Sequence, residues 1–292
     1  MQSRLRGLSA ATLMMAAGAL IAWTSVIAKA LGTGFGGEDI HPLTITAGRF
    51  VFAFAALTPV IAVVRPGFAG AAWPIHIGRV ITGWGGATLL FASAALIPLA
   101  DANAIAFLAP VVTIALSVIF LGEQIGRRWG PAAIALTGAL ILARPGTDAF
   151  RPAALLAFAA AASMGTEMTF IKRLSDDEPL LRILTISNGF GTVLSVAAAS
   201  LVFETPTLAQ AGAMTLLGLS MLSAQVLFLT AMQRSDASAV APFLYLVPLY
   251  AAAYDWLLFS ETVTLVSGIG IATIITGAAM LAARERPAAQ AR

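Results

Sequence analysis

Side chains that could do covalent chemistry are scarce in this sequence. It has no cysteine, which excludes thiolate nucleophiles, disulfides and Cys-ligated metals. The two histidines, His41 and His76, are expected near helix ends without a G-x-S-x-G motif, and two histidines alone make a poor metal site. The Tyr254–Asp255 pair lacks the second aspartate, in a Gly-x-Gly-Asp setting, that intramembrane aspartyl proteolysis would need. We therefore predict no catalytic residue, no bound metal and no cofactor.

One segment has the residue spacing of a cofactor-binding motif but not the surrounding secondary structure that such a motif needs. GTGFGG, Gly32 to Gly37, has the G-x-G-x-x-G spacing of dinucleotide-binding loops. Such a loop binds pyrophosphate where it joins a strand to a helix in a βαβ unit. Here the segment follows an apolar stretch of helix length and precedes EDIHP. We interpret it as a loop at the end of a helix.

A group of polar and aromatic side chains lies inside long apolar segments, where binding chemistry is possible. A polar group at membrane depth is costly and by default faces a cavity or a partner. The group comprises Trp23, Trp84, Asn103, Glu167, Asn188, Gln225, Tyr245 and Asp255. Within it we predict a substrate-binding set of Trp23, Trp84, Glu167, Gln225 and Tyr245.

Each member of the group also has a purely structural interpretation. Glu167 and Asp255 each lie about one turn from a helix end, where an ion pair is the alternative; for Glu167 the candidate partners are Lys172 and Arg173. The amides of Asn188 and Gln225 could instead bond across helices. The two tryptophans could pack as wedges or contact lipid.

The composition identifies the elements that hold these residues. Of the 292 residues, 59% are hydrophobic and 11% are charged, whereas soluble domains carry about 25% charge. The mean hydropathy of +0.90 is too high for a water-facing shell, so we predict an integral membrane protein. The pI of 9.8 follows from basic loops on one side of a membrane, and no dense basic run indicates nucleic acid.

Continuous apolar runs predict an all-α membrane protein with ten transmembrane helices, because most reach the roughly 20 residues that span a bilayer. Alternating runs, which a barrel would need, are missing. We expect helices at Leu8–Ala30, Leu43–Val64, Ile75–Leu99, Ala102–Leu121, Gly126–Ala143, Pro152–Ile171, Leu180–Val202, Leu208–Met232, Ala237–Phe259 and Val263–Ala283.

The N-terminal segment has two interpretations. Its basic residues, apolar stretch and A-x-A at Ala28 to Ala30 could belong to a secretory signal peptide. Its apolar run, however, is about 20 residues long, which spans a bilayer, and many similar segments follow. We predict a first transmembrane helix.

The basic residues predict the orientation, because cytoplasmic loops carry the excess of Lys and Arg. With a cytoplasmic N-terminus, thirteen basic residues fall inside and four outside, when Arg49 and Arg79 are counted at the nearer membrane face. Both termini are then cytoplasmic. The four outer residues are Lys29, Arg49, Arg144 and Arg151.

The chain contains a weak internal repeat. The matched pairs are Asp101 and Asp236, Pro110 and Pro248, Glu123 and Glu261, and Gly130 and Gly268, the last three with an offset of 138 residues. We divide the chain into five-helix repeats at 1–146 and 147–292. Five is odd, so the second repeat is expected to be inverted in the membrane, as in many secondary transporters with a central cavity.

Each repeat places a proline thirteen residues before a glutamate, at Pro110 and Pro248. A proline inside a helix removes a backbone bond, and neighbouring helices can tolerate the kink in a membrane. We predict that both prolines are hinges, with the arm after each proline packed on helix five or ten and the other arm able to swing. The alternative is that they only shape the cavity.

These patterns together resemble the drug/metabolite transporter superfamily with two EamA-type halves. AWTS at Ala22 to Ser25 is similar to a first-helix feature of that family. The second half has Ser260 in place of Gly122 and lacks the tryptophan. The motif residues are Ala102, Ala104, Phe107, Leu108, Pro110, Phe120 to Glu123, Trp129, Gly130 and Gly138, then Ala237, Pro248, Glu261 and Gly268.

The resemblance implies export of small metabolites through a central cavity, with helices five and ten outside the ring that surrounds it. The length and the first-helix tryptophan look most like aromatic-amino-acid exporters of the YddG type. Glu167 is the first candidate for proton coupling, although an uncoupled facilitator fits equally well.

We predict a bacterial inner-membrane transporter that exports small amphipathic metabolites, most of all amino acids, by alternating access. Its partners are the small-molecule substrate and the lipid bilayer, not nucleic acid, and we expect a monomer. The alternatives are a passive facilitator or channel and an integral-membrane enzyme. The sequence shows neither a selectivity filter nor a nucleophile with its base.

Overall fold

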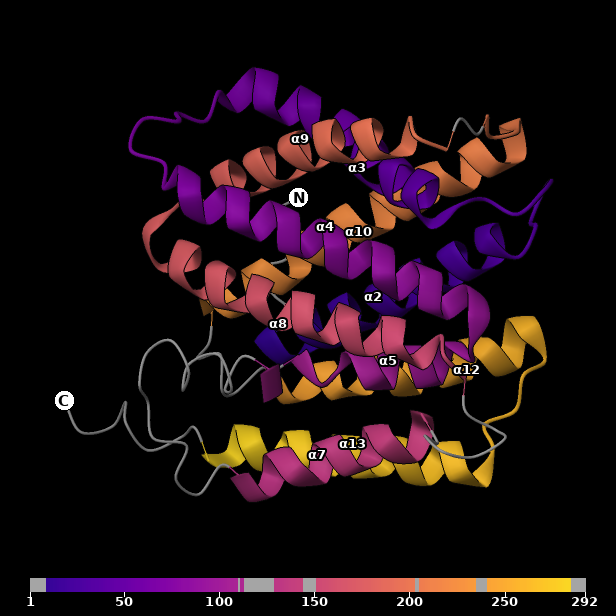
Figure 1. Ribbon diagram of the computed structural model, residues 1–292. Coiled ribbons are helices and arrows are strands. Elements are labelled where there is room, and N and C mark those ends of the chain that lie inside the picture. The colour runs from indigo at the N-terminus through magenta and orange to yellow at the C-terminus, as the bar shows by residue number, and fades with distance from the viewer. Residues whose placement is uncertain are drawn as a thin grey trace.

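The computed structural model describes residues 9–109, 111–112, 129–143, 151–202, 205–234 and 241–284, and within them it contains ten α-helices, one short 3₁₀ helix and no strand (Figure 1). The prediction of an all-α fold is confirmed. The helices are α2 (Ala10–Gly32), α3 (Pro42–Val64), α4 (Trp73–Leu96), α5 (Leu99–Ala106), α7 (Trp129–Ala143), α8 (Ala154–Asp177), α9 (Leu180–Ala199), α10 (Leu208–Arg234), the 3₁₀ helix η2 (Ala241–Leu246), α12 (Val247–Phe259) and α13 (Leu265–Arg284).

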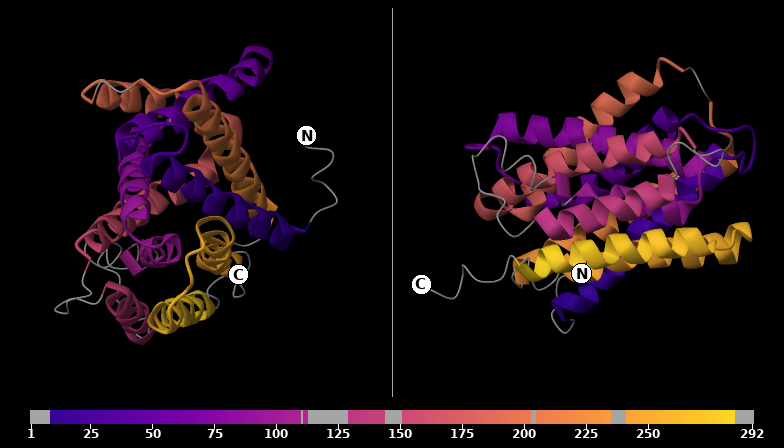
Figure 2. Two further views of the ribbon diagram at one scale, coloured as in Figure 1. Left: turned by 90° about the vertical axis from the view of Figure 1, so that its right-hand side faces the viewer. Right: turned by 60° about the horizontal axis from the view of Figure 1, so that its bottom comes forward.

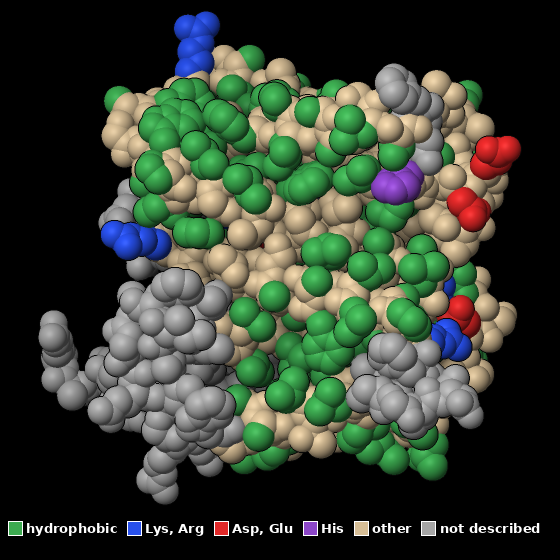
Figure 3. Space-filling model, viewed as in Figure 1, with side chains coloured by type: hydrophobic (Ala, Val, Ile, Leu, Met, Phe, Trp, Pro, Cys, Tyr) green, Lys and Arg blue, Asp and Glu red, His purple; other side chains and the backbone are tan. Residues whose placement is uncertain are grey.

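Five of these helices are long and apolar enough to cross a membrane, namely α2, α3, α9 and most of α8 and α10. Shorter apolar stretches lie in α7 and α13. Hydrophobic side chains cover the middle of the face seen in Figure 3, and charged side chains stand toward its edges. This distribution suits a bundle whose outer surface contacts lipid.

Local sequence explains several helix ends. Ser9 caps α2 by accepting a hydrogen bond from the amide of Thr12 at 3.1 Å. Pro42 begins α3, where a missing N–H costs nothing. The GTGFGG segment ends α2 in a turn with Gly34 and Gly36 at φ of 90° and 72°, which confirms the loop interpretation.

The helices pack in pairs that join the two halves of the chain. The main pairs are α2 with α10, α4 with α8, α3 with α9, and α7 with α13. Counted along each half, α2 corresponds to α8, and α4 corresponds to α10. The contact of α2 with α10 therefore has its equivalent in the contact of α8 with α4, as two related five-helix units would require. The repeat boundaries and the inversion of the second repeat stay predictions.

The pair α7 and α13 lies at one edge of the molecule, beside α5 and η2 (Figures 1 and 2). Its two helices approach backbone to backbone, because a Cβ atom added to Gly138 would lie 2.7 Å from the carbonyl oxygen of Gly270. A Cβ atom at Gly277 would meet the amide of Ala135. Small residues at a membrane helix interface allow such close packing.

The ninth predicted helix, 237–259, is wrong as a single continuous element. Residues 241–246 form the 3₁₀ helix η2, and α12 begins only at Val247, with Pro248 in its first turn. A proline is tolerated in the first turn but would remove a backbone bond further inside a helix, so the α-helix begins just before it.

The expected packing around Pro248 is also corrected. The arm after this proline, α12, packs mainly on α2 and α5, and it is the short arm before it, η2, that contacts α13. The other hinge candidate, Pro110, lies outside the described residues. Of the predicted helix 102–121, the described residues form α5, which begins at Leu99, three residues earlier than predicted, and ends at Ala106.

A polar cluster outside the membrane-spanning segments joins α4, α8 and α9. The carboxylate of Glu178 accepts hydrogen bonds from the amide of Ala72 and from His76 Nε2, both at 2.9 Å, and lies 4.0 Å from Arg182 Nη1. Burial opposes ionisation of Glu178, but the donors of Ala72 and His76 and the charge of Arg182 outweigh it and lower the pKa of this carboxyl below its ordinary 4.5. Glu178 therefore stabilises the fold as an anion.

The lowered pKa predicts how stability depends on pH. Because Glu178 binds its proton less readily in the folded protein, its contribution is complete above about pH 4.5 and is lost as the pH falls through the lowered folded value. We expect Glu178→Gln to be less stable than wild type at neutral pH, with a difference that shrinks below pH 4.5. Thermal unfolding in detergent between pH 3 and pH 7 measures this, and a difference that does not change with pH would contradict it.

Candidate functional site

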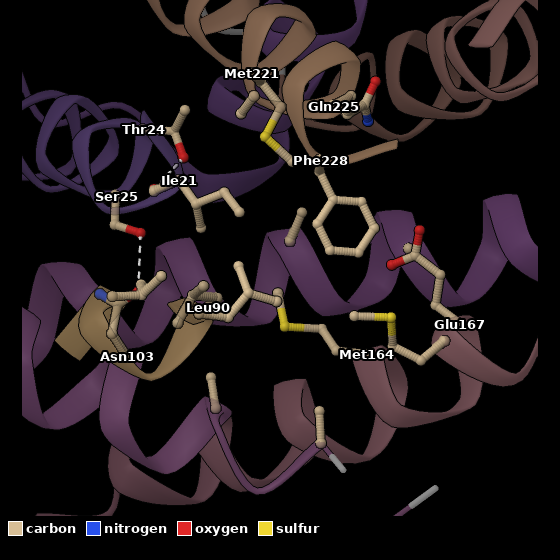
Figure 4. Close-up of a pocket in the computed structure, with 18 of the residues that line it drawn as sticks. Ile21, Thr24, Ser25, Leu90, Asn103, Met164, Glu167, Met221, Gln225 and Phe228 are labelled. Atoms are coloured by element: carbon tan, nitrogen blue, oxygen red, sulfur yellow. Dashed lines mark hydrogen bonds between the residues drawn. The ribbon is translucent and has the colours of Figure 1, made fainter. Parts of the chain in front are cut away.

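A cavity of about 300 Å³ lies between helices of both halves of the chain. Its wall comes from α2, α3, α4, α5, α8, α10 and both arms of helix nine, and most of it is apolar. Figure 4 shows Ser25 and Asn103 at one end, Glu167 and Gln225 at the other, and the side chains of Met164 and Phe228 between them. The cavity is also lined by Arg49, Arg79, Leu90, Phe107, Met221, Leu244 and Val247.

Among the described residues, three charged side chains line this cavity: Arg49 from α3, Arg79 from α4 and Glu167 from α8. Both arginines are buried, with 5% and 4% of their surface exposed. Arg79 Nε lies 3.7 Å from Glu167 Oε1, and the Arg79 guanidinium donates a hydrogen bond to Ser187 Oγ of α9. Arg79 is therefore paired with a charge and with a hydroxyl.

Arg49 is held differently. Its guanidinium carbon lies 4.6 Å from the ring centre of Phe50. Its Nε and Nη1 atoms are buried, and no described residue accepts a hydrogen bond from them. A guanidinium has five N–H donors and stays protonated in proteins, so this side chain retains unused donors beside the cavity.

The glycines of the RVITGWGG segment make room for the charges. A Cβ atom added to Gly83 would lie 2.7 Å from Glu167 Oε1, and one at Gly86 would lie 2.8 Å from the Met164 side chain. Only glycine at position 83 lets the Glu167 carboxylate approach α4 this closely. These glycines therefore allow α4 to pack closely against α8.

The structure brings some of the predicted binding residues together. Glu167 and Gln225 line the cavity. Trp84 borders a small adjoining space of about 10 Å³, which it shares with Arg49, Arg79, Glu167 and Gln225, and its Nε1 atom is buried without a partner among the described residues.

The remaining predicted binding residues lie elsewhere or outside the described side chains. Trp23 is not in the cavity wall and packs edge-on against Tyr254, with ring centres 5.6 Å apart. The Tyr245 side chain lies outside the described part of the chain. Asn188 Nδ2 donates a hydrogen bond to Gln225 Oε1 at 3.3 Å. This bond supports the structural alternative for the two amides, in which they bond across helices.

The sequence analysis missed Arg49 and Arg79 as site residues. It counted them at membrane faces, whereas the structure places both in the cavity wall. A signal was available, because each lies at least six residues inside a helix and is flanked by apolar or small neighbours. Without them the basic residues still divide twelve to three (thirteen minus Arg79, four minus Arg49), so the predicted orientation does not depend on them.

A second ionic cluster lies at the C-terminal end of α2. Lys29 Nζ lies 3.0 Å from Asp255 Oδ1 and 2.8 Å from Glu261 Oε2, and 4.6 Å from the centre of the Phe259 ring. The other Asp255 oxygen accepts a hydrogen bond from the amide of Ala100 at 3.0 Å. The ion-pair interpretation of Asp255 is therefore correct.

This cluster lies about one turn beyond the cavity along two helices. On α2 it follows Ser25, and on α5 it precedes Asn103, and both of these residues line the cavity. Its bonds hold α2, α5 and α12 together at that end. Elsewhere among the described residues, no three His, Asp or Glu side chains gather as a metal site would require.

Comparison with known proteins identifies the family. Residues 8–144 and 151–283 each match the EamA-like transporter family. A solved crystal structure with 20% sequence identity superposes with a TM-score of 0.62, covering 96% of this chain and 100% of its own. At that identity the likeness shows the fold alone.

Three curated relatives span most of the chain. An S-adenosylmethionine uptake transporter of Rickettsia bellii is 29% identical over 81% of this chain and 80% of its own. A riboflavin transporter of Rhizobium johnstonii is 31% identical over 72% and 70%. A pseudopaline exporter of Pseudomonas aeruginosa is 28% identical over 75% and 80%. All three names describe transport of a small molecule.

The Lys29 cluster predicts a large stability effect. Lys29→Met would leave the Asp255 carboxylate, whose side chain is 3% exposed, without its cation, and we expect a loss of about 3–5 kcal/mol in the free energy of unfolding. Asp255→Asn in the Lys29→Met background should recover part of that loss, because the unpaired charge is removed. Denaturation in detergent measures both, with the exposed Arg151→Met as control. Lys29→Met protein as stable as wild type would refute the pairing.

Proposed function

We propose that this chain, which belongs to the EamA-like transporter family, exports small amphipathic metabolites, amino acids in particular, across the bacterial inner membrane by alternating access. The cavity carries the proposal, because it is enclosed by helices of both halves, apolar along most of its wall and charged at one end. Membership of this family and the named relatives support a multi-pass membrane transporter of small molecules.

The size of the cavity supports a small substrate. At about 30 Å³ for each water in the liquid, a volume of about 300 Å³ equals about ten waters, which is enough for one solute of amino-acid size. Small-molecule sites in proteins begin at about this volume.

The chemistry of the wall supports an amphipathic substrate. Phe107, Phe228 and Met164 offer surfaces for an apolar side chain, and sulfur and aromatic groups both contact aromatic rings favourably. Glu167 and Gln225 lie together at one end (Figure 4) and can orient polar groups. Aromatic amino acids combine both features.

Alternating access is supported by the break in helix nine and by the cluster at Lys29. The cavity wall includes Leu244 before the break and Val247 after it, so a movement at this joint would change the cavity. We propose Pro248 as a hinge, and Pro110 as its counterpart. The Lys29 cluster is the closure at the outer end in this proposal.

The direction and the energy source need their own test. Export is the direction that the family resemblance implies, whereas the relatives include one named for uptake and one named for export. A facilitator needs no coupling, whereas a proton-coupled exporter could use Glu167.

Transport by the purified protein in proteoliposomes tests the function. We expect efflux of preloaded phenylalanine and leucine, and a faster rate under a proton gradient if Glu167 is coupled. Trp84→Ala should lower the transport efficiency for phenylalanine about tenfold or more, the effect of losing roughly 1.4 kcal/mol of contact. The lipid-facing Trp256→Ala, at 62% exposed, is the control.

Two outcomes would count against this assignment. No transport of any amino acid in the panel would remove the proposed substrate class. Unchanged transport in the alanine variants of Trp23, Trp84, Glu167, Gln225 and Tyr245 would remove the proposed binding set. Each variant should elute as folded protein before its transport is compared.

Pro248→Ala tests the hinge. Because Pro248 lies in the first turn of α12, alanine costs no native hydrogen bond there but allows the α-helix to extend backwards into η2. We expect substrate binding to be kept and turnover to fall severalfold, as measured by equilibrium binding and transport rate. Pro42→Ala, in the first turn of α3, is the matched control. Equal turnover in wild type and Pro248→Ala would leave the proline as a determinant of shape alone.

A further inference from the structure

We propose that Arg49 binds a carboxylate group of the substrate, with Trp84 Nε1 as a second donor. The inference rests on the proposed function and makes its substrate class more specific: the transported metabolite is a carboxylate-bearing amphiphile. It concerns the small space that adjoins the main cavity and is bordered by Arg49, Arg79, Trp84, Glu167, Ser187 and Gln225.

Unused hydrogen-bond donors gather around this small space. Arg49 Nε and Nη1, Arg79 Nε and Trp84 Nε1 are all buried, and none has a hydrogen-bond partner among the described residues. A buried donor without an acceptor is costly, and more so when it is charged. Three neighbouring side chains therefore need a hydrogen-bond acceptor.

The balance of charge favours an anion. Arg49 and Arg79 provide two positive charges to the cavity wall and Glu167 one negative charge, so one positive charge is in excess. Arg79 lies next to Glu167 and bonds to Ser187, whereas Arg49 feels the charge of Glu167 only at longer range and keeps two buried donors without an acceptor. A singly charged anion at Arg49 would make the site neutral.

Other charged and amide groups nearby are already engaged. Lys29 is paired with Asp255 and Glu261 at the far end of α2 and does not line the cavity. The Gln225 carbonyl oxygen accepts from Asn188, which directs its amide nitrogen to other partners. Gln225 can thus donate toward the same space, and among the described residues the other cation that borders it, Arg79, already lies beside Glu167 and bonds to Ser187.

The shape of the site favours a carboxylate over a larger anion. The adjoining space has about 10 Å³ of free volume, close to the minimum that holds one oxygen-sized group. A planar carboxylate can place one oxygen there and keep the rest of the molecule in the main cavity. Its geometry matches the donor edges of a guanidinium, whereas a tetrahedral phosphate would bring further oxygens into the same space.

Two sets of matched compounds test the inference. One set is phenylalanine, 3-phenylpropanoate and 2-phenylethylamine, and the other is leucine, 4-methylpentanoate and 3-methylbutylamine. Within each set the apolar part is similar, and the carboxylate is present in the first two compounds only. Binding to the full-length protein in detergent is measured by calorimetry and by the shift in its unfolding temperature.

We expect the wild-type protein to bind the carboxylates roughly 10- to 100-fold more tightly than the amines, the effect of hydrogen bonds to a charged group. Arg49→Gln should abolish this preference and leave amine binding unchanged. Arg49→Lys keeps the charge but loses the planar donor edge, so it should retain only part of the preference. Trp84→Phe keeps a ring and removes the Nε1 donor, and should weaken carboxylate binding severalfold.

The controls separate loss of the donor from loss of the fold. Arg151→Gln removes an exposed arginine and should bind all six compounds like wild type. Should Arg49→Gln fail to fold, Arg49→Lys and Trp84→Phe carry the test. A wild-type protein with no preference for carboxylates, or a preference that survives in the Arg49 variants, would overturn the inference, since water could then satisfy these donors.

The transport assay distinguishes this failure from failure of the proposed function. If wild type exports amino acids and Arg49→Gln exports them equally well, the carboxylate site is wrong and the transporter assignment remains. If carboxylates bind in an Arg49-dependent way but none is transported, the site is correct and amino-acid export is wrong.

Discussion

The cost of placing charged groups among apolar helices is the constraint on which this structure depends. Lys29, Arg49, Arg79, Glu167 and Asp255 all lie in helices of a strongly apolar chain, where each charge must face a partner or a cavity. This requirement sets the rotation of α2, α3, α4, α8 and α12 about their axes. Small residues at the contacts, such as Gly83 beside Glu167, then allow the helices to approach closely enough for the charges to meet.

The two charged clusters satisfy this requirement to different degrees. Lys29 has two carboxylates and an aromatic ring, and Asp255 has a cation and a backbone amide. That cluster is complete and holds three helices together. At Arg49 and Trp84, by contrast, buried donors remain without acceptors. A site that is left incomplete beside a cavity is the arrangement that a ligand can complete.

The helices were predictable from the sequence because continuous apolar runs of bilayer length have few alternative structures. The same local logic identified the loop at GTGFGG and the polar group that contains Glu167 and Gln225. Local sequence patterns could not reveal the pairing of Arg79 with Glu167 and Ser187, which lie about 90 to 110 positions away in the chain. These side chains meet only because α4 packs against α8 and α9. The position of a tryptophan along a helix likewise does not reveal which face it occupies, and the ring of Trp23 packs against Tyr254.

The break in helix nine lies at the cavity wall. Beyond the break, α12 is tied to α2 and α5 through Asp255, whereas η2 contacts α13 at the edge of the bundle. Both arms contact α2, and η2 has α13 as a further neighbour, with the joint at Val247 and Pro248 between the two arms. Leu244 before the break and Val247 after it both line the cavity, so any movement at this joint would change the shape of the cavity, as the proposed alternating access requires.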